Sequence, residues 1–111
     1  MQIVSQDVKN ASMDDLTDKE VIDIIKETLE YGYVIPSRHA KEQMFNRGYS
    51  ISDLRFILKN GKIIKREKLD NNQRGFTFKG NDLQGHPGEV VISLDAGARK
   101  MVIITVKGGV K

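Results

Sequence analysis

Apolar side chains in the first half of the chain recur three and four positions apart, which is the period of an amphipathic α-helix. Val21, Ile25 and Leu29 follow this spacing after a Thr17–Glu20 capping box, with acidic residues on the opposite face. Two further helices are predicted, each with a serine cap before it and a glycine after it. The three predicted helices cover residues 14–31, 37–47 and 50–60, the third beginning at Ser50 or Ser52, and they stop at Gly32, Gly48 and Gly61.

The second half of the chain changes to a period of two, which is typical of strands with one buried face. Four strands are predicted, over residues 62–68, 74–79, 89–94 and 100–106. The last three are joined by turns rich in Gly, Asn and Asp, so they should pair antiparallel. Residues 33–36 are expected to form a short extended link, because the residue before Pro36 avoids the helical region.

Strand alternation assigns the side chains of the predicted sheet to two faces. The face expected to pack on the helices carries Phe76, Phe78, Val90, Ile92, Leu94, Val102, Ile104 and Val106. The other face carries Thr77, Lys79, Val91, Ser93, Met101, Ile103, Thr105 and Lys107. We therefore expect an α+β fold, with two or three N-terminal helices packed on one face of a four-stranded antiparallel sheet. Residues 1–13 show no period and are expected to be a flexible leader before a single domain over residues 14–111.

Composition narrows the possible compartments and cofactors of this 111-residue chain. It has no cysteine, which excludes disulfides and thiolate metal sites and favours a reducing cytoplasm. No apolar run is long enough to span a membrane, and the first residues do not resemble a secretory signal. Two histidines are too few for a typical zinc site, so we expect neither a metal nor another cofactor.

Charge divides the chain into an acidic beginning and a basic body. Residues 1–35 carry eight acidic residues and three lysines, a net charge of −5, whereas residues 36–111 carry fifteen Lys and Arg against seven acidic residues, a net charge of +8. The basic body could attract a polyanion such as nucleic acid. The two parts could instead neutralise each other, and the acidic first helix could fold over the basic sheet as an internal mimic of a nucleic-acid backbone.

The second predicted helix carries the most informative chemistry in the chain. His39, Gln43 and Arg47 are successive i, i+4 neighbours and share one face of that helix. A histidine and an arginine held two turns apart could act on a phosphate, and the hydroxyl and ammonium groups of the second sheet face could hold a phosphodiester. Both features could equally be ordinary solvated surface.

Three motifs in order resemble a known family. His39 followed by Arg47-Gly48-Tyr49-Ser50, then Phe76-Thr77-Phe78-Lys79-Gly80, and finally Ile104-Thr105-Val106 resemble domain-of-unknown-function family 4258 over about residues 35–107. That family is similar to the small toxin ribonucleases of the RelE and barnase kind. The resemblance implies a RelE/barnase-like fold, metal-independent RNA cleavage and an antitoxin-like protein partner.

RNA cleavage without a metal needs a base, an acid and cations around the phosphorane, and the candidate residues can be given these roles. His39 would act as the acid–base group, Arg47 would contact the phosphate, and Thr105 would orient the scissile group. Flanking phosphates would be bound by Arg38, Lys41, Lys79 and Lys107. The function expected is therefore a metal-independent endoribonuclease of the toxin type, acting on RNA in the cytoplasm and away from membranes.

Each of these residues also has a structural interpretation. His39 could simply bond a backbone carbonyl at a helix start, and Arg47 could pair with Asp53 or Glu42 or cap the helix C-terminus. His86 could be a second acid–base group but fits better as a solvated turn residue. The tyrosines could stack on bases or be partly buried: these are Tyr31, Tyr33 and Tyr49. The alternative function is a non-catalytic module that binds nucleic acid or a protein.

Overall fold

The computed structural model describes residues 16–69, 73–95 and 97–109, which form three helices and five strands. The leader expected over residues 1–13, and the first residues of the first predicted helix, lie outside this part of the chain. In chain order the elements are α2 (Asp18–Tyr31), β1 (Tyr33–Pro36), α3 (Arg38–Arg47), α4 (Ile51–Asn60), β2 (Lys62–Lys68), β3 (Arg74–Asn81), β4 (Pro87–Asp95) and β5 (Lys100–Gly108). The predicted α+β class is confirmed.

The helices begin and end where their capping residues predict. The Thr17 side chain accepts from the Glu20 N–H in a capping box that opens α2, and the Ser37 side chain accepts from the Ala40 N–H at the start of α3. Gly48 ends α3 in the left-handed conformation, with φ of 72°, which glycine adopts without steric cost. Of the two serines offered for α4, Ser50 is the N-cap.

The sheet differs from the prediction in its strand number and direction. Its order is β1-β5-β4-β3-β2, and the four strands from β2 to β5 pair antiparallel in sequence order as predicted. The expected link over residues 33–36 is a fifth strand, β1, which pairs parallel with β5. The Tyr33 N–H donates to the Arg99 carbonyl at 2.8 Å and the Ser37 N–H donates to the Ile103 carbonyl at 2.8 Å. The prediction of a four-stranded antiparallel sheet was therefore wrong, and the sheet is five-stranded and mixed.

A β-bulge in β5 reverses the faces expected for the first half of that strand. Val91 of β4 lies opposite Thr105, but the next residue, Ile92, lies opposite Ile103, so Ile104 has no partner. Simple alternation counted back from Val106 therefore assigns the residues before the bulge to the wrong face. Met101 and Ile103 are fully buried in the core. Val102 and Ile104, which were expected inside, are only partly buried.

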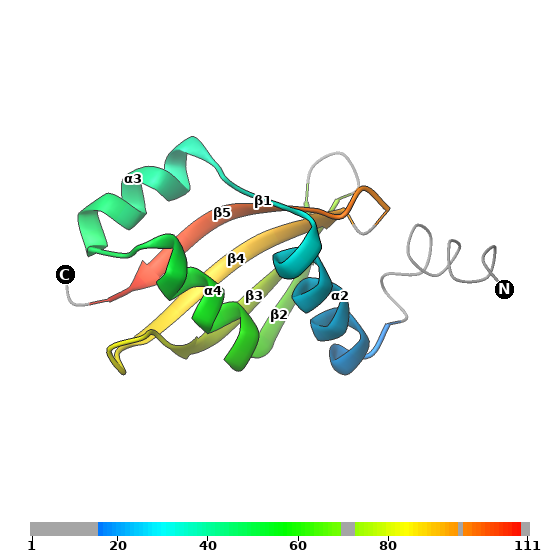
Figure 1. The fold of residues 1–111 in the computed structure, drawn as a ribbon, viewed down its shortest axis with the longest axis horizontal. Helices are drawn as coiled ribbons and strands as arrows, with labels where there is room; N and C mark the ends of the chain where they lie inside the picture. The colour runs from blue at the N-terminus through cyan, green and yellow to red at the C-terminus, as the bar shows by residue number, and fades with distance from the viewer. Residues whose placement is uncertain (1–15, 70–72, 96, 110–111) are drawn as a thin grey trace, which may run out of the picture.

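Helices α2 and α4 lie on one side of the sheet, which we call the inner face, and α3 runs along the edge of β5 (Figure 1). The core between them contains the largest fully buried side chains: Phe76, Phe78, Ile25, Leu54, Ile57, Leu58, Ile92, Met101, Ile103, Val21, Val90 and Val106. The acidic helix α2 belongs to this layer and packs against α4 and β1. It does not cover the opposite side of the sheet, the outer face, so the hypothesis of an acidic helix folded over the basic sheet face was wrong for α2.

Candidate functional site

Helix α3 runs beside β5 and supplies hydrogen bonds to its edge beyond the point where β1 ends (Figure 1). The Ser37 hydroxyl donates to the Ile104 carbonyl at 3.3 Å, and the Val106 N–H donates to the Gln43 side-chain oxygen at 2.7 Å. The Arg47 guanidinium donates to the Gly108 carbonyl at 3.3 Å. These three side chains therefore form hydrogen bonds with the backbone groups at the end of β5, as a neighbouring strand would.

The predicted catalytic residues come from two neighbouring elements, His39 and Arg47 from α3 and Thr105 from β5. Arg47 is bound to backbone, and among the described residues it forms no ion pair with either Glu42 or Asp53. His39 is exposed and has no hydrogen bond or ion pair with any other residue that the structure describes. Thr105 lies on the outer face, half-buried and opposite Val91. No hydrogen bond between described residues joins the three.

Arg38 and Lys41 lie on the solvent side of α3. Both are exposed, and Arg38 forms a 4.0 Å ion pair with Glu42 that is open to solvent on both sides. Phe45 shares their stripe, because residues three, four and seven positions apart lie on one side of a helix. Its side chain is 86% exposed. His39 and Gln43 are on a different flank of the same helix, so α3 does not gather all its predicted site residues on one surface.

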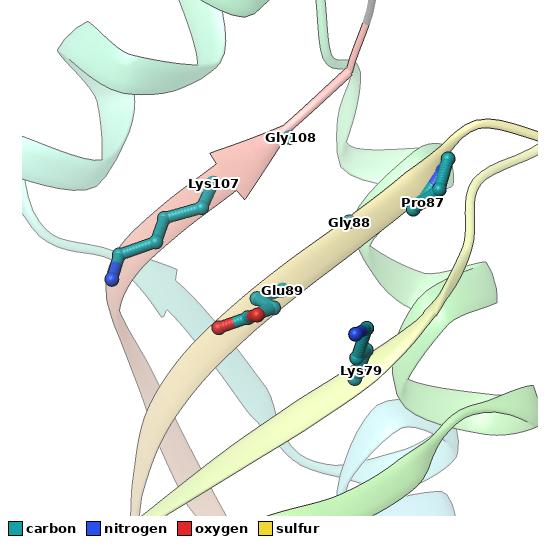
Figure 2. A pocket seen from close by; sticks show the side chains of 6 residues that line it. All are labelled: Lys79, Pro87, Gly88, Glu89, Lys107 and Gly108. Carbon is teal, nitrogen blue, oxygen red and sulfur yellow. The ribbon is translucent and has the colours of Figure 1, made fainter.

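The two lysines predicted on the sheet, Lys79 and Lys107, do lie together on the outer face. Cross-strand pairing places Lys62 beside Lys79, Lys79 beside Glu89, and Glu89 beside Lys107, so the four form one row across β2, β3, β4 and β5. In Figure 2 the side chains of Lys79, Glu89 and Lys107 project from the same side of their strands. Among the described residues Glu89 forms no ion pair with either lysine, so both ammonium groups are open to an external anion.

This row lies beside a shallow hollow of about 200 Å³ (Figure 2). Its lining consists of Lys79, Pro87, Gly88, Glu89, Lys107 and Gly108. The outer-face threonines Thr77 and Thr105 follow one step along the strands, on either side of Val91. Thr105 is half-buried, whereas Thr77 is only 6% exposed. Ammonium groups near the partly exposed Thr105 are suited to contact a phosphodiester, with Glu89 as the one opposing charge in the row.

A buried polar cluster at the end of the sheet was missed by the sequence reasoning. Asp82 begins the β3–β4 turn, is only 3% exposed, and accepts the N–H groups of Gln84 at 2.9 Å and His86 at 3.0 Å. Burial alone would raise the pKa of Asp82, but these hydrogen bonds outweigh it and hold the pKa below its ordinary 3.8. The His86 ring nitrogen Nδ1 lies 3.8 Å from the carboxylate.

Tyr49 lies beside Asp82 in this cluster, at the junction between α3 and α4. Its hydroxyl is buried without a hydrogen bond of good geometry to any described residue, and burial together with the Asp82 carboxylate raises the pKa of Tyr49 to about 12. Gly88 is required beside it, because a Cβ there would come within 2.4 Å of the hydroxyl oxygen. The Asp82-Leu83-Gln84-Gly85 turn was the available signal for Asp82. Nothing local marked Tyr49 as its neighbour.

Comparison with known proteins finds a family match that starts at the last residue of β1 and ends within β5. The model of the family described as "Domain of unknown function (DUF4258)" matches residues 36–107, well over half of the chain. The chain belongs to this family. The DUF4258 region therefore contains α3, α4 and all four antiparallel strands, whereas α2 and most of β1 lie before it. No curated protein and no solved structure is significantly similar to the chain.

Two further observations concern the described part of this DUF4258 protein. It holds no group of three or more His, Asp and Glu side chains placed to bind a metal ion. Across the same residues, no helix combines the length and the apolar character needed to cross a membrane.

Proposed function

We propose that this protein binds RNA across the outer face of its sheet. The observation that carries the proposal is the row of Lys62, Lys79 and Lys107, contributed by three strands and interrupted only by Glu89. Lysines dispersed over a surface are common, but lysines aligned across a sheet face that none of the described helices covers match the repeated charge of a phosphate backbone. The net charge of +8 over residues 36–111 would draw the polyanion toward this body.

Mutation of the row provides the test of RNA binding. A Lys79→Ala/Lys107→Ala double variant should bind a fluorescein-labelled 12-nucleotide oligouridine more weakly than the wild-type protein in fluorescence anisotropy. The slope of log K against log salt should fall by about 1.4, because each phosphate contact on a single strand contributes roughly 0.7. The matched control is Lys26→Ala/Lys59→Ala, which removes the same charge from exposed positions on α2 and α4.

The comparison between the two double variants decides the outcome. Net charge changes equally in both, so a general electrostatic effect would weaken binding to the same extent in each. Equal losses would contradict a binding surface on the outer face. Wild-type binding that is insensitive to ionic strength would contradict phosphate recognition altogether.

A second candidate function is cleavage of the bound RNA, as in the RelE/barnase-like toxin ribonucleases that the DUF4258 motifs resemble. The observation that favours it is the exposed, unpaired imidazole of His39. Ser37 bonds the Ile103 and Ile104 carbonyls and Gln43 bonds Val106, so the backbone of His39 runs beside the stretch of β5 that holds Thr105. Under this proposal Arg47 acts by holding α3 on β5.

The proposed reaction uses the RNA's own 2′-hydroxyl as nucleophile. His39 takes the proton from this hydroxyl, the 2′-oxygen forms a bond to phosphorus, and the bond from phosphorus to the 5′-oxygen breaks. The leaving 5′-oxygen takes a proton from water, and the imidazolium returns its proton to the hydroxide so formed. The products are a 2′,3′-cyclic phosphate and a free 5′-hydroxyl, and no metal ion takes part in these steps.

Substitution of His39 tests this reaction. His39→Ala should lower the cleavage rate of a labelled RNA by roughly 10²–10⁴-fold, the usual contribution of a general acid–base residue, and should leave RNA affinity unchanged. His86→Gln is the control, because it removes the second imidazole of the chain. Expression of the wild-type protein without an antitoxin-like partner should also slow growth, and expression of His39→Ala should not. Intact RNA after prolonged incubation with the wild-type protein between pH 5 and 9 would exclude cleavage.

A further inference from the structure

The outer face carries an exposed aromatic side chain at the end opposite to its lysine row. Tyr33 is the first residue of β1, and its side chain is 69% exposed. Val34 packs against the core on the inner face. Because neighbouring side chains of a strand point to opposite faces, Tyr33 and Ile35 project from the outer face.

The register between β1 and β5 shows what surrounds this tyrosine. Tyr33 lies beside Lys100, and Ile35 lies beside Val102. The inward side chains of β5 are those of Met101 and Ile103, which confirms that Lys100 and Val102 share the outer face with Tyr33. None of the three helices in the described part of the chain covers this face. An aromatic ring next to a lysine is thus open to solvent at one end, and the lysine row lies at the other.

We propose that the RNA held on this face is single-stranded and that one of its bases stacks on Tyr33. This deepens the proposed function and rests on it. Lys107 follows Lys100 by seven positions along β5, so the tyrosine and the lysine row are roughly 23 Å apart at 3.3 Å per residue. A single strand of several nucleotides can span this distance, with its phosphates on Lys79 and Lys107 and an unstacked base on the ring.

The chemistry of the face favours a single strand over a duplex and over a protein partner. The bases of a duplex are stacked on one another and cannot place a face on Tyr33, whereas the bases of a single strand are free to stack on an aromatic side chain. Ile35 and Val102 add apolar surface beside the ring. The lysine row at one end of this surface complements a polyanion and would leave unpaired charges under an apolar protein, whereas Lys100 at the other end lies opposite Asp95.

The test compares three aromatic positions of the full chain. Tyr33→Ala should lower the affinity for 12-nucleotide oligouridine by about five- to 150-fold, the usual effect of removing one base–aromatic stack. Tyr33→Phe should restore it, since the π-face remains. Tyr31→Ala and Phe45→Ala, which remove side chains that are 74% and 86% exposed on the helices, should leave the affinity unchanged. Urea unfolding of each variant confirms that it is folded.

A fluorescence measurement tests the same proposal with an aromatic ring still present at position 33. The chain contains no tryptophan, so Tyr33→Trp introduces a single indole whose fluorescence should be quenched by oligouridine and much less by a 12-base-pair RNA duplex. Absence of quenching at saturating oligouridine would overturn the stacking proposal, as would an equal loss of duplex affinity in Tyr33→Ala.

The two proposals fail in different ways. If Tyr33→Ala binds oligouridine as the wild-type protein does, and Lys79→Ala/Lys107→Ala still binds it weakly, the stacking proposal is wrong and RNA binding stands. If the wild-type protein binds neither oligouridine nor the duplex, both proposals are wrong. A loss that is equal in Tyr33→Ala, Tyr31→Ala and Phe45→Ala would also overturn a role specific to Tyr33.

Discussion

At the scale of single residues, Asp82 shows how a buried charge can serve the fold alone. Its carboxylate accepts two backbone N–H groups of the β3–β4 turn. Asp82→Ala leaves both donors without their partner, whereas Asp82→Asn keeps an oxygen that can accept them. We expect a clearly lower melting temperature for Asp82→Ala than for Asp82→Asn at pH 7, measured by circular dichroism. Equal melting temperatures would contradict the role of this oxygen.

The pH dependence of Asp82 follows from the same hydrogen bonds. Its pKa is lower in the folded protein than the ordinary 3.8, so the folded state binds a proton less readily than the unfolded state does. The stabilisation is therefore present above about pH 4 and is lost as the pH falls through the folded pKa. Asp82→Asn should accordingly flatten the acid side of the stability profile. An unchanged acid limb in this variant would show that other carboxylates govern it.

At the scale of elements, α3 protects the edge of β5, and Gln43 is the side chain with the shortest bond to it. Gln43→Ala should lower the free energy of unfolding by about 1–3 kcal/mol, because the Val106 N–H then has no partner. Lys41→Ala is the matched control, since Lys and Gln have similar helix propensities and Lys41 is exposed. It should change stability by less than about 0.5 kcal/mol. Urea unfolding measures both, and similar effects in the two variants would contradict the edge role of Gln43.

The elements that could be predicted from the sequence are those whose signals are local. Caps and glycines mark the helices, and Thr17, Ser37 and Ser50 are the N-caps of α2, α3 and α4. Helix α2 begins at Asp18, later than the predicted start at residue 14. Strand β1 could not be recognised, because its four residues end in a proline and their partners in β5 lie 67 positions later in the chain. The bulge at Ile104 could not be predicted either. The run Met101–Val106 is apolar in nearly every position, so the sequence does not show which of its residues face the core.

The candidate site was partly predictable for the same reason. Lys79 and Lys107 were placed on one face because simple alternation holds for β3 and for the end of β5 after the bulge. Arg47 was expected to contact a phosphate. However, α3 ends beside the edge of β5, where the Gly108 carbonyl accepts a hydrogen bond from the Arg47 guanidinium. Which acceptor a guanidinium finds depends on packing between α3 and β5, which no local pattern specifies.

At the scale of the whole molecule, the family match and the folded unit have different boundaries. The match to DUF4258 begins at residue 36, yet α2 contributes Val21, Ile25 and Leu29 to the same core as the residues of α4 and the sheet. The helix also reaches the far edge of the sheet through the 2.6 Å ion pair between Asp18 and Arg66. The chain should therefore unfold as one cooperative unit that includes α2.

Paired core substitutions test this unity. Ile25 in α2 and Ile57 in α4 are both fully buried, one outside the matched region and one inside it. Each substitution to Ala should lower the free energy of unfolding by about 2–5 kcal/mol, because it leaves a cavity in the shared core. Both variants should keep a single urea transition with coincident fluorescence and circular dichroism curves. If α2 were only an appended helix, Ile25→Ala would instead produce an early, separate transition. The urea midpoint of the main transition would then equal that of the wild-type protein, and only Ile57→Ala would lower it.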